Sequence, residues 1–200
     1  MLGELLAHPG VEETCTLRSR FGILAFHGGN LERGTDTIAA AAAERSGSSL
    51  YAIRQPPDLS WHLPSVAFDP AASPALARFV DHVEAVVAVH GYGREDMWTT
   101  LLVGGQNRWL AAGLRRELEG ALGDGFSVVD DLEAIPERLR GQHPRNPVNL
   151  PRLAGAQLEL PPRVRPGTGA PTFRVAYETA VVDALAAVAA AWPGDGMQPR

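Results

Sequence analysis

Two apolar segments of the sequence each end in a His-Gly pair. Residues 21–26 lead into His27 and two glycines, and residues 85–89 lead into His90 and Gly91. Runs that are apolar at every position are typical of strands buried on both faces of an α/β sheet. Ligands of open α/β sheets collect outside the carboxyl ends of the strands, so the two histidines are expected to lie side by side there. The sequence therefore predicts a polar site at that edge of the sheet.

Glu32 follows His27 by five residues, on the loop that leaves the first of these runs. Imidazole nitrogen and carboxylate oxygen are both good zinc donors. The single cysteine, Cys15, excludes an intramolecular disulfide and a cysteine zinc cluster, so a metal would need His, Asp or Glu ligands. His27, Glu32 and His90 are the candidate metal ligands.

The rest of the chain alternates strand and helix signals. Each strand signal is a short apolar run and each helix signal is an amphipathic or alanine-rich stretch. They predict an α/β fold: one domain over residues 1–192, built on an open mixed sheet flanked by helices, with a flexible tail at 193–200. A helix expected at 37–45 should be capped by Thr35 or Asp36 and stop near Gly47. Further strands are expected at 49–53, 101–105, 126–129 and 156–160, and further helices at 74–82, 107–122, 131–140 and 173–192.

Glu159 stands within an otherwise apolar strand. Alternation over residues 156–160 places Gln157 and Glu159 on one face and leucines on the other. If that face meets solvent, the glutamate needs no further explanation. If it faces the metal site, Glu159 is a candidate general base.

Composition limits the kinds of partner. The 200 residues carry a net charge of -5, with 45% hydrophobic and 20% charged residues, and all 18 basic residues are arginine. This is a globular composition without the basic face that nucleic acid binding needs. Residues 1–10 do not read as a secretory signal, and the apolar stretch 184–192 is too short to cross a bilayer. We expect a soluble, cytoplasmic monomer.

Six motifs occur in an order and spacing that resemble the poly-gamma-glutamate hydrolase family. They are FHGGNLERGTDTIA, SWHLPSVAFD, AVHGYG, LLVGG, HPRNPVN and GAQLELP, and the resemblance covers roughly residues 10–190. It implies a zinc-carboxypeptidase-like core with one zinc ion per chain. Carried over residue by residue, the resemblance gives His27, Glu32 and His90 as the zinc ligands and Glu159 as the base.

The sequence departs from the family pattern at two positions. Asn30 stands where a third glycine is expected, and Leu150 stands where the family often has arginine. Arg145 or Arg152 could supply the missing cation, since a guanidinium offers a planar donor fork to a carboxylate.

Several further residues are candidates for binding substrate. Arg94 could stabilise an oxyanion, and His62 could line the cleft or orient a metal ligand. The polar segment 141–155 adds candidates for gripping substrate carboxylates: Arg145, Asn146, Asn149 and Arg152.

The resemblance implies a zinc-dependent hydrolase of gamma-glutamyl amide bonds, with poly-gamma-glutamate as the expected substrate. One alternative is a related zinc deacylase that acts on an N-acyl amino acid or an aminoacyl ester. Another is a non-catalytic zinc-binding protein of the same fold, which the presence of all four residues His27, Glu32, His90 and Glu159 argues against.

Overall fold

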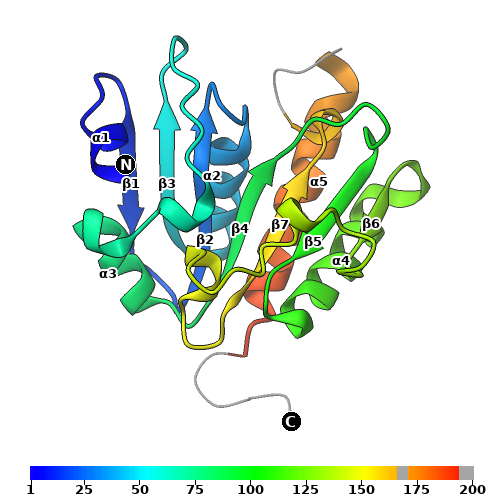
Figure 1. Cartoon of the computed structure of the whole chain (residues 1–200). Coiled ribbons are helices and arrows are strands. Elements are labelled where there is room, and N and C mark those ends of the chain that lie inside the picture. Colours follow the sequence, from blue (N-terminus) through cyan, green and yellow to red (C-terminus); the bar gives the residue numbers. More distant parts are fainter. Residues whose placement is uncertain (166–170, 194–200) are drawn as a thin grey trace.

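A seven-stranded mixed sheet runs through the molecule in the order β1-β3-β2-β4-β7-β5-β6 (Figure 1). In this computed structural model the described residues are 1–165 and 171–193, with side chains described for 1–165 and 176–193. Strands β3, β2, β4 and β7 run parallel to one another. β1 is antiparallel to β3, β5 is antiparallel to β7, and β6 is parallel to β5. The strands are Glu12–Thr16, Phe21–Gly29, Ser49–Gln55, Ala85–Gly91, Thr100–Gly104, Ser127–Val129 and Gly155–Leu160, numbered β1 to β7. The predicted open mixed sheet is confirmed.

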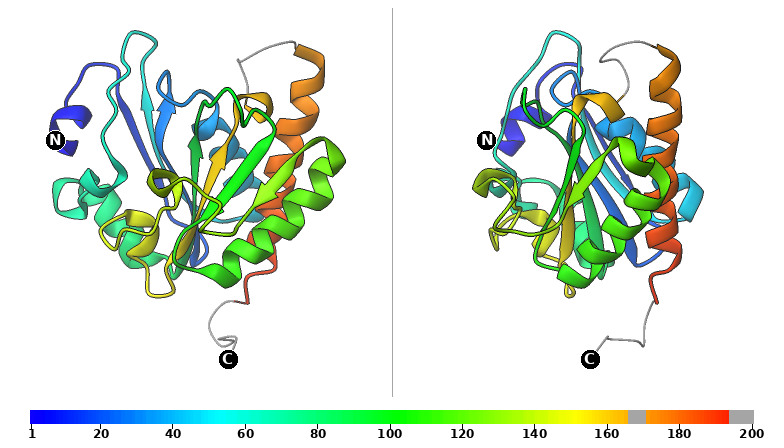
Figure 2. Two further views of the ribbon diagram at one scale, coloured as in Figure 1. Left: turned by 45° about the vertical axis from the view of Figure 1, so that its right-hand side comes forward. Right: turned by 90° about the vertical axis from the view of Figure 1, so that its right-hand side faces the viewer.

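Helices cover both faces of this sheet. One face packs against α2 (Thr35–Ser46), α4 (Arg108–Leu122) and α5 (Pro171–Ala190), and the opposite face packs against α1 (Leu2–Leu6) and α3 (Pro74–His82). In the rotated view of Figure 2 the sheet separates α5 from α1. Because successive strand residues point to opposite faces, Val87 and Val89 join the first core and Val86 and Ala88 the second.

The chain changes direction across the sheet at β2. From β2 it passes through α2 to β3 on one side, and from β3 it returns through α3 to β4 on the other side of β2. The carboxyl ends of β2 and β4 therefore flank a topological switch point, where open α/β sheets bind ligands.

Most predicted helix boundaries lie within a few residues of the observed ones. Ser73 and Asn107 cap α3 and α4, since each side chain accepts a hydrogen bond from a backbone N–H in the first turn. Gly47 ends α2 in the left-handed conformation, as predicted, with φ of 69°.

The predicted N-cap of α2 was wrong. The cap position is Gly34, with φ of 86°, and Thr35 is already helical, with its hydroxyl donating to Glu32 O at 2.8 Å. The Asp36 carboxylate instead accepts a hydrogen bond from Gly29 N at 3.2 Å. Both side chains thus fix the loop between β2 and α2 rather than the helix end.

The predicted helix at 131–140 was also wrong. The segment consists of turns and one short 3-10 turn, Glu137–Leu139. Asp131 accepts from Glu133 N at 3.0 Å, and Pro136 lacks an N–H for a continuous helical ladder. The segment lies beside the carboxyl ends of the central strands.

Among the described residues, no helix has both the length and the apolar character to cross a membrane. Of the predicted tail at 193–200, residues 194–200 lie outside the described residues.

Candidate metal centre

His27 and His90 lie next to each other at the switch point. They end the apolar parts of β2 and β4, and their ring centroids are 5.1 Å apart. Both side chains are nearly inaccessible to solvent, with exposed fractions of 2% and 3%.

A β-bulge gives His27 its direction. Between β2 and β3 the register shifts after Ala25, which pairs with Ala52, because Gly28 then pairs with Arg54. Without the shift, alternation would point His27 to the α2 face. Its ring instead packs 5.5 Å from that of Phe68 on the opposite face, the face to which His90 also belongs by alternation. A bulge of one residue is a known means of re-aiming a side chain at a site.

Glu32 bridges the two histidines. Its Oε1 lies 2.8 Å from His27 Nδ1, and its Oε2 lies 3.5 Å from His90 Nδ1 and accepts a 2.8 Å hydrogen bond from Gly91 N. The tight loop before Glu32 requires Gly29, since φ there is 71° and an added Cβ would lie 2.1 Å from Gln55 O. The loop therefore delivers the carboxylate between the two rings.

The hydrogen bonds of His27 fit a metal cation. Its Nε2 lies 2.8 Å from Leu63 O, and a carbonyl can only accept, so Nε2 carries the hydrogen. In a neutral ring Nδ1 then presents a lone pair to a Glu32 oxygen that is also an acceptor, and the contact needs a proton or a cation. Among the described residues the buried Nε2 of His90 has no hydrogen-bond partner, and one ligand atom each of His27, Glu32 and His90 can be chosen with all three within 4.8 Å of one another.

The charges of the cluster are strongly coupled. Burial alone would raise the pKa of Glu32, but the neighbouring His90 and His27 hold it well below the ordinary value. Burial lowers and the Glu32 carboxylate raises the pKa of His27, with a net increase. An anionic glutamate thus sits between two nitrogen donors, which is the charge arrangement of a cation site.

Glu159 lies directly beside this cluster. It is the partner of His90 in the register of β7 and β4, and its side chain is buried, which excludes the solvent-facing interpretation. Burial and the nearby Glu32 charge raise the pKa of Glu159 to about 7, against the opposing effect of His90. A carboxyl group that titrates near neutrality suits proton transfer.

A cavity of about 1080 Å³ opens in front of these four residues. His62 lines it, with its ring centroid 5.0 Å from that of His27, and burial together with His27 lowers the pKa of His62. The carbonyl that orients His27 belongs to Leu63, the next residue.

The other predicted substrate residues are dispersed. Asn146 is buried and lines the cavity. The side-chain amide of Asn149 instead forms hydrogen bonds with backbone atoms of Gln106, Gly141 and His143. Arg94 and Arg145 are exposed and do not line the cavity. Arg152 pairs with Glu84 at 3.1 Å, just before β4 and therefore at the end of the sheet opposite His90.

Sequence reasoning missed one wall of the cavity. It is formed by residues 137–143, which include Arg138, Arg140 and His143. Arg138 is exposed and has no hydrogen-bond or ion-pair partner among the described residues, while Arg140 Nε donates to Ile135 O at 2.8 Å. The only sequence signal was the presence of two arginines just before the polar segment 141–155. Because both lie within the helix that was expected at 131–140, they were not considered as cavity residues.

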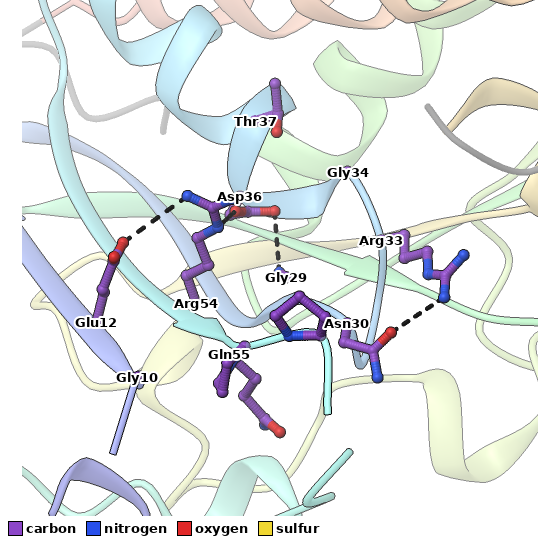
Figure 3. Close-up of a pocket in the computed structure, with 12 residues that line it drawn as sticks. Gly10, Glu12, Gly29, Asn30, Arg33, Gly34, Asp36, Thr37, Arg54 and Gln55 are labelled. Carbon is purple, nitrogen blue, oxygen red and sulfur yellow. Dashed lines mark hydrogen bonds and ion pairs between the residues drawn. The ribbon is translucent and has the colours of Figure 1, made fainter. Parts of the chain in front are cut away.

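A second cavity, of about 550 Å³, lies beside the loop Gly29–Asp36 (Figure 3). Its charges largely neutralise one another, since Arg54 lies 3.8 Å from both Glu12 and Asp36. None of the three candidate metal ligands lines it.

The fold and the site together define an open α/β protein with a buried His/Glu/His cluster of potential metal ligands. A bacteriophage poly-gamma-glutamate hydrolase shares the fold, with a TM-score of 0.73 at 22% identity over 92% of this chain and 93% of that one. A Burkholderia mallei structure with the provisional description of a carboxypeptidase matches with a TM-score of 0.51 at 10% identity, covering 96% of this chain and 66% of that one. The predicted carboxypeptidase-like core is confirmed.

The chain belongs to the poly-gamma-glutamate hydrolase family, whose model matches residues 4–168. Bacillus subtilis YndL is 32% identical over 54% of this chain, and the prophage-derived YoqZ of the same organism is 32% identical over 68%. The chain spans only 40% and 46% of these relatives. A zinc-free structure of YndL superposes with a TM-score of 0.64 at 26% identity, over 86% of this chain and 87% of that one.

Proposed function

We propose that this protein is a zinc-dependent hydrolase of gamma-glutamyl amide bonds, with poly-gamma-glutamate as substrate. The observation that carries the proposal is the buried Glu159 beside the His27, Glu32 and His90 cluster, at the base of a large cavity. Family membership supports a hydrolase, and the solved zinc-free structure of YndL supports zinc as the metal.

His27, Glu32 and His90 would hold the metal. Bound zinc would lower the pKa of a water molecule and polarise the amide carbonyl. The Leu63 carbonyl fixes the His27 tautomer, and Gly91 N holds the Glu32 carboxylate by its Oε2. These contacts keep the donor atoms directed at one point without the rings having to reorient.

Glu159 would move the proton. As the carboxylate it accepts a proton from the attacking water, and as the acid it gives that proton to the leaving nitrogen. One group can do both because burial brings its pKa to about 7. The hydroxyl of the water becomes part of the new carboxyl group and the leaving amine gains the proton, so the step balances.

The cavity wall supports an anionic substrate. Each gamma-linked glutamate retains a free α-carboxylate next to the amide bond. Arg138 and Arg140 line the cavity, and Arg138 is unpaired among the described residues, so its guanidinium is available to a carboxylate. We assign substrate carboxylates to this wall in place of Arg145 and Arg152.

Product analysis with a defined gamma-glutamyl oligomer tests the proposal. Zinc-loaded protein should release shorter gamma-glutamyl products, and chelation should stop the release. An N-acyl amino acid offered in parallel tests the deacylase alternative. Turnover of that small amide alone would overturn the polymer assignment, and bound zinc without turnover of either substrate would favour a non-catalytic protein.

A further inference from the structure

Two buried amide side chains connect the cavity wall to Glu159. Asn146 Nδ2 donates to Gln157 Oε1 at 2.8 Å, and Gln157 Nε2 donates to Glu159 Oε1 at 2.8 Å. Asn146, Gln157 and Glu159 have exposed fractions of 3%, 4% and 3%. Water therefore has little access to these three side chains, and each amide must form its hydrogen bonds within the protein.

Backbone groups at the two amides fix the direction of these hydrogen bonds. Val148 N donates to Asn146 Oδ1 at 3.2 Å, so the NH₂ group of Asn146 must point to Gln157. The second N–H of Gln157 approaches Leu139 O at 3.5 Å, and a carbonyl only accepts. Both contacts require the carbonyl oxygen of Gln157 to face Asn146 and its NH₂ group to face Glu159.

Packing holds Gln157 in this position. Gly141 has φ of 63°, and a Cβ added there would lie 2.7 Å from both Cβ and Oε1 of Gln157. A glycine at 141 thus lets the wall segment close against the amide, leaving little space for another rotamer.

We infer that Asn146 and Gln157 are positioning residues that reserve one oxygen of Glu159 as a permanent acceptor. Oε1 receives the Gln157 N–H, so a proton on Glu159, which lines the cavity, resides on Oε2. This inference rests on the proposed role of Glu159 as the base, but the direction of the hydrogen bonds can be tested separately. These two hydrogen bonds, from Asn146 to Gln157 and from Gln157 to Glu159, are called the relay. The relay would keep the proton on the oxygen that can reach water and the leaving nitrogen.

The test is Asn146→Asp. Aspartate keeps an oxygen for Val148 N but places a second acceptor against Gln157 Oε1, so the Gln157 amide must flip. Asn107→Asp is the matched control, because Asn107 also accepts from a backbone N–H, at Leu110, and donates to a backbone carbonyl, at Leu153, both at 2.9 Å.

The first measurement is the side-chain amide NMR signal of Gln157 in metal-free protein, identified by its loss in Gln157→Met. The inference predicts a large shift of this signal in Asn146→Asp and none in Asn107→Asp. An unchanged signal in folded Asn146→Asp would overturn it. This measurement does not depend on catalysis, so it separates failure of the relay from failure of the proposed hydrolase.

The second measurement is turnover by the zinc-loaded variants. Asn146→Asp should lower kcat by about 10-fold or more with little change in KM and with zinc retained. Asn107→Asp should retain the kcat of the wild-type protein. If Asn146→Asp does not fold, Gln157→Met, which has a similar length and no donor, must show the same loss of kcat. Wild-type kcat in either folded variant would contradict the relay.

Discussion

His90 and Glu159 are direct partners in the parallel register of β4 and β7. The proposed base is therefore placed beside a proposed metal ligand by sheet pairing and not by a mobile loop. Each strand has a period of two residues, so a register slip of one residue would turn Glu159 to the opposite, apolar face. The geometry of the site is built into the core of the sheet.

Glu159→Gln tests the role of this residue. The amide has nearly the same shape but cannot accept the proton, so kcat should fall by about 10²- to 10⁴-fold while bound zinc is unchanged. Glu137→Gln is the control, because Glu137 lines the same cavity and is exposed. A variant at Glu159 that retains wild-type kcat would remove it from the mechanism.

The pH dependence of stability tests the burial of Glu159 without any substrate. Its pKa rises from 4.5 to about 7 on folding, so the folded state holds a proton that the unfolded chain has lost. This contribution is fully present below 4.5 and is lost as pH rises through about 7.

Denaturant titrations of metal-free protein between about pH 4 and pH 8 provide the measurement. The wild-type free energy of unfolding should decline over this range relative to that of Glu159→Gln. Parallel curves for the two proteins would show that Glu159 does not titrate differently on folding.

Arg138→Gln tests the cavity wall. Hydrogen bonds to charged groups contribute about 1.5–3 kcal/mol, and solvent exposure reduces this, so KM for a gamma-glutamyl oligomer should rise about 10-fold. Arg94→Gln and Arg145→Gln remove equally exposed charges outside the cavity and should leave KM unchanged. A rise in KM in Arg145→Gln without a rise in Arg138→Gln would return the carboxylate contact to Arg145, which the sequence suggested.

Gly29→Ala tests the loop that delivers Glu32. Gly47→Ala is its control, since φ is similar at the two positions, 71° and 69°, but nothing lies within 4 Å of an added Cβ at Gly47. The control should cost about 1–2 kcal/mol from its left-handed backbone alone. Gly29→Ala should lower Tm further and weaken zinc binding, because its Cβ would meet Gln55 O. Equal effects would mean that the loop can shift without disturbing the site.

The sequence predicted that His27 and His90 lie side by side because each histidine follows a strong local signal. His27 and His90 end apolar runs, and strands of that kind lie next to each other in α/β sheets. The bulge that turns His27 to the correct face leaves no mark in the local pattern, since it depends on the pairing of β2 with β3. Glu159 was found by alternation, but only its burial distinguished a cavity face from a solvent face.

The cavity wall formed by residues 137–143 could not be predicted because it depends on tertiary contacts. Pro136 argues against a continuous helix over residues 131–140, but the position of the segment depends on backbone contacts such as Gly105 N to Arg140 O, at 2.8 Å, which hold part of it against the loop after β5. Arg152 lies close in sequence to Asn149 but reaches Glu84 at the far end of the sheet. Proximity in sequence therefore did not indicate which arginines line the cavity.

Zinc stoichiometry tests the central claim most directly. Protein stripped with a chelator and then titrated with zinc should bind about one ion per chain with high affinity, and His90→Ala should abolish that binding while the fold persists by circular dichroism. His82→Ala, at the end of α3, is the control and should bind as the wild-type protein does. High-affinity zinc binding that survives in His90→Ala, or its absence from the wild-type protein, would contradict the assignment of His27, Glu32 and His90 as the metal site.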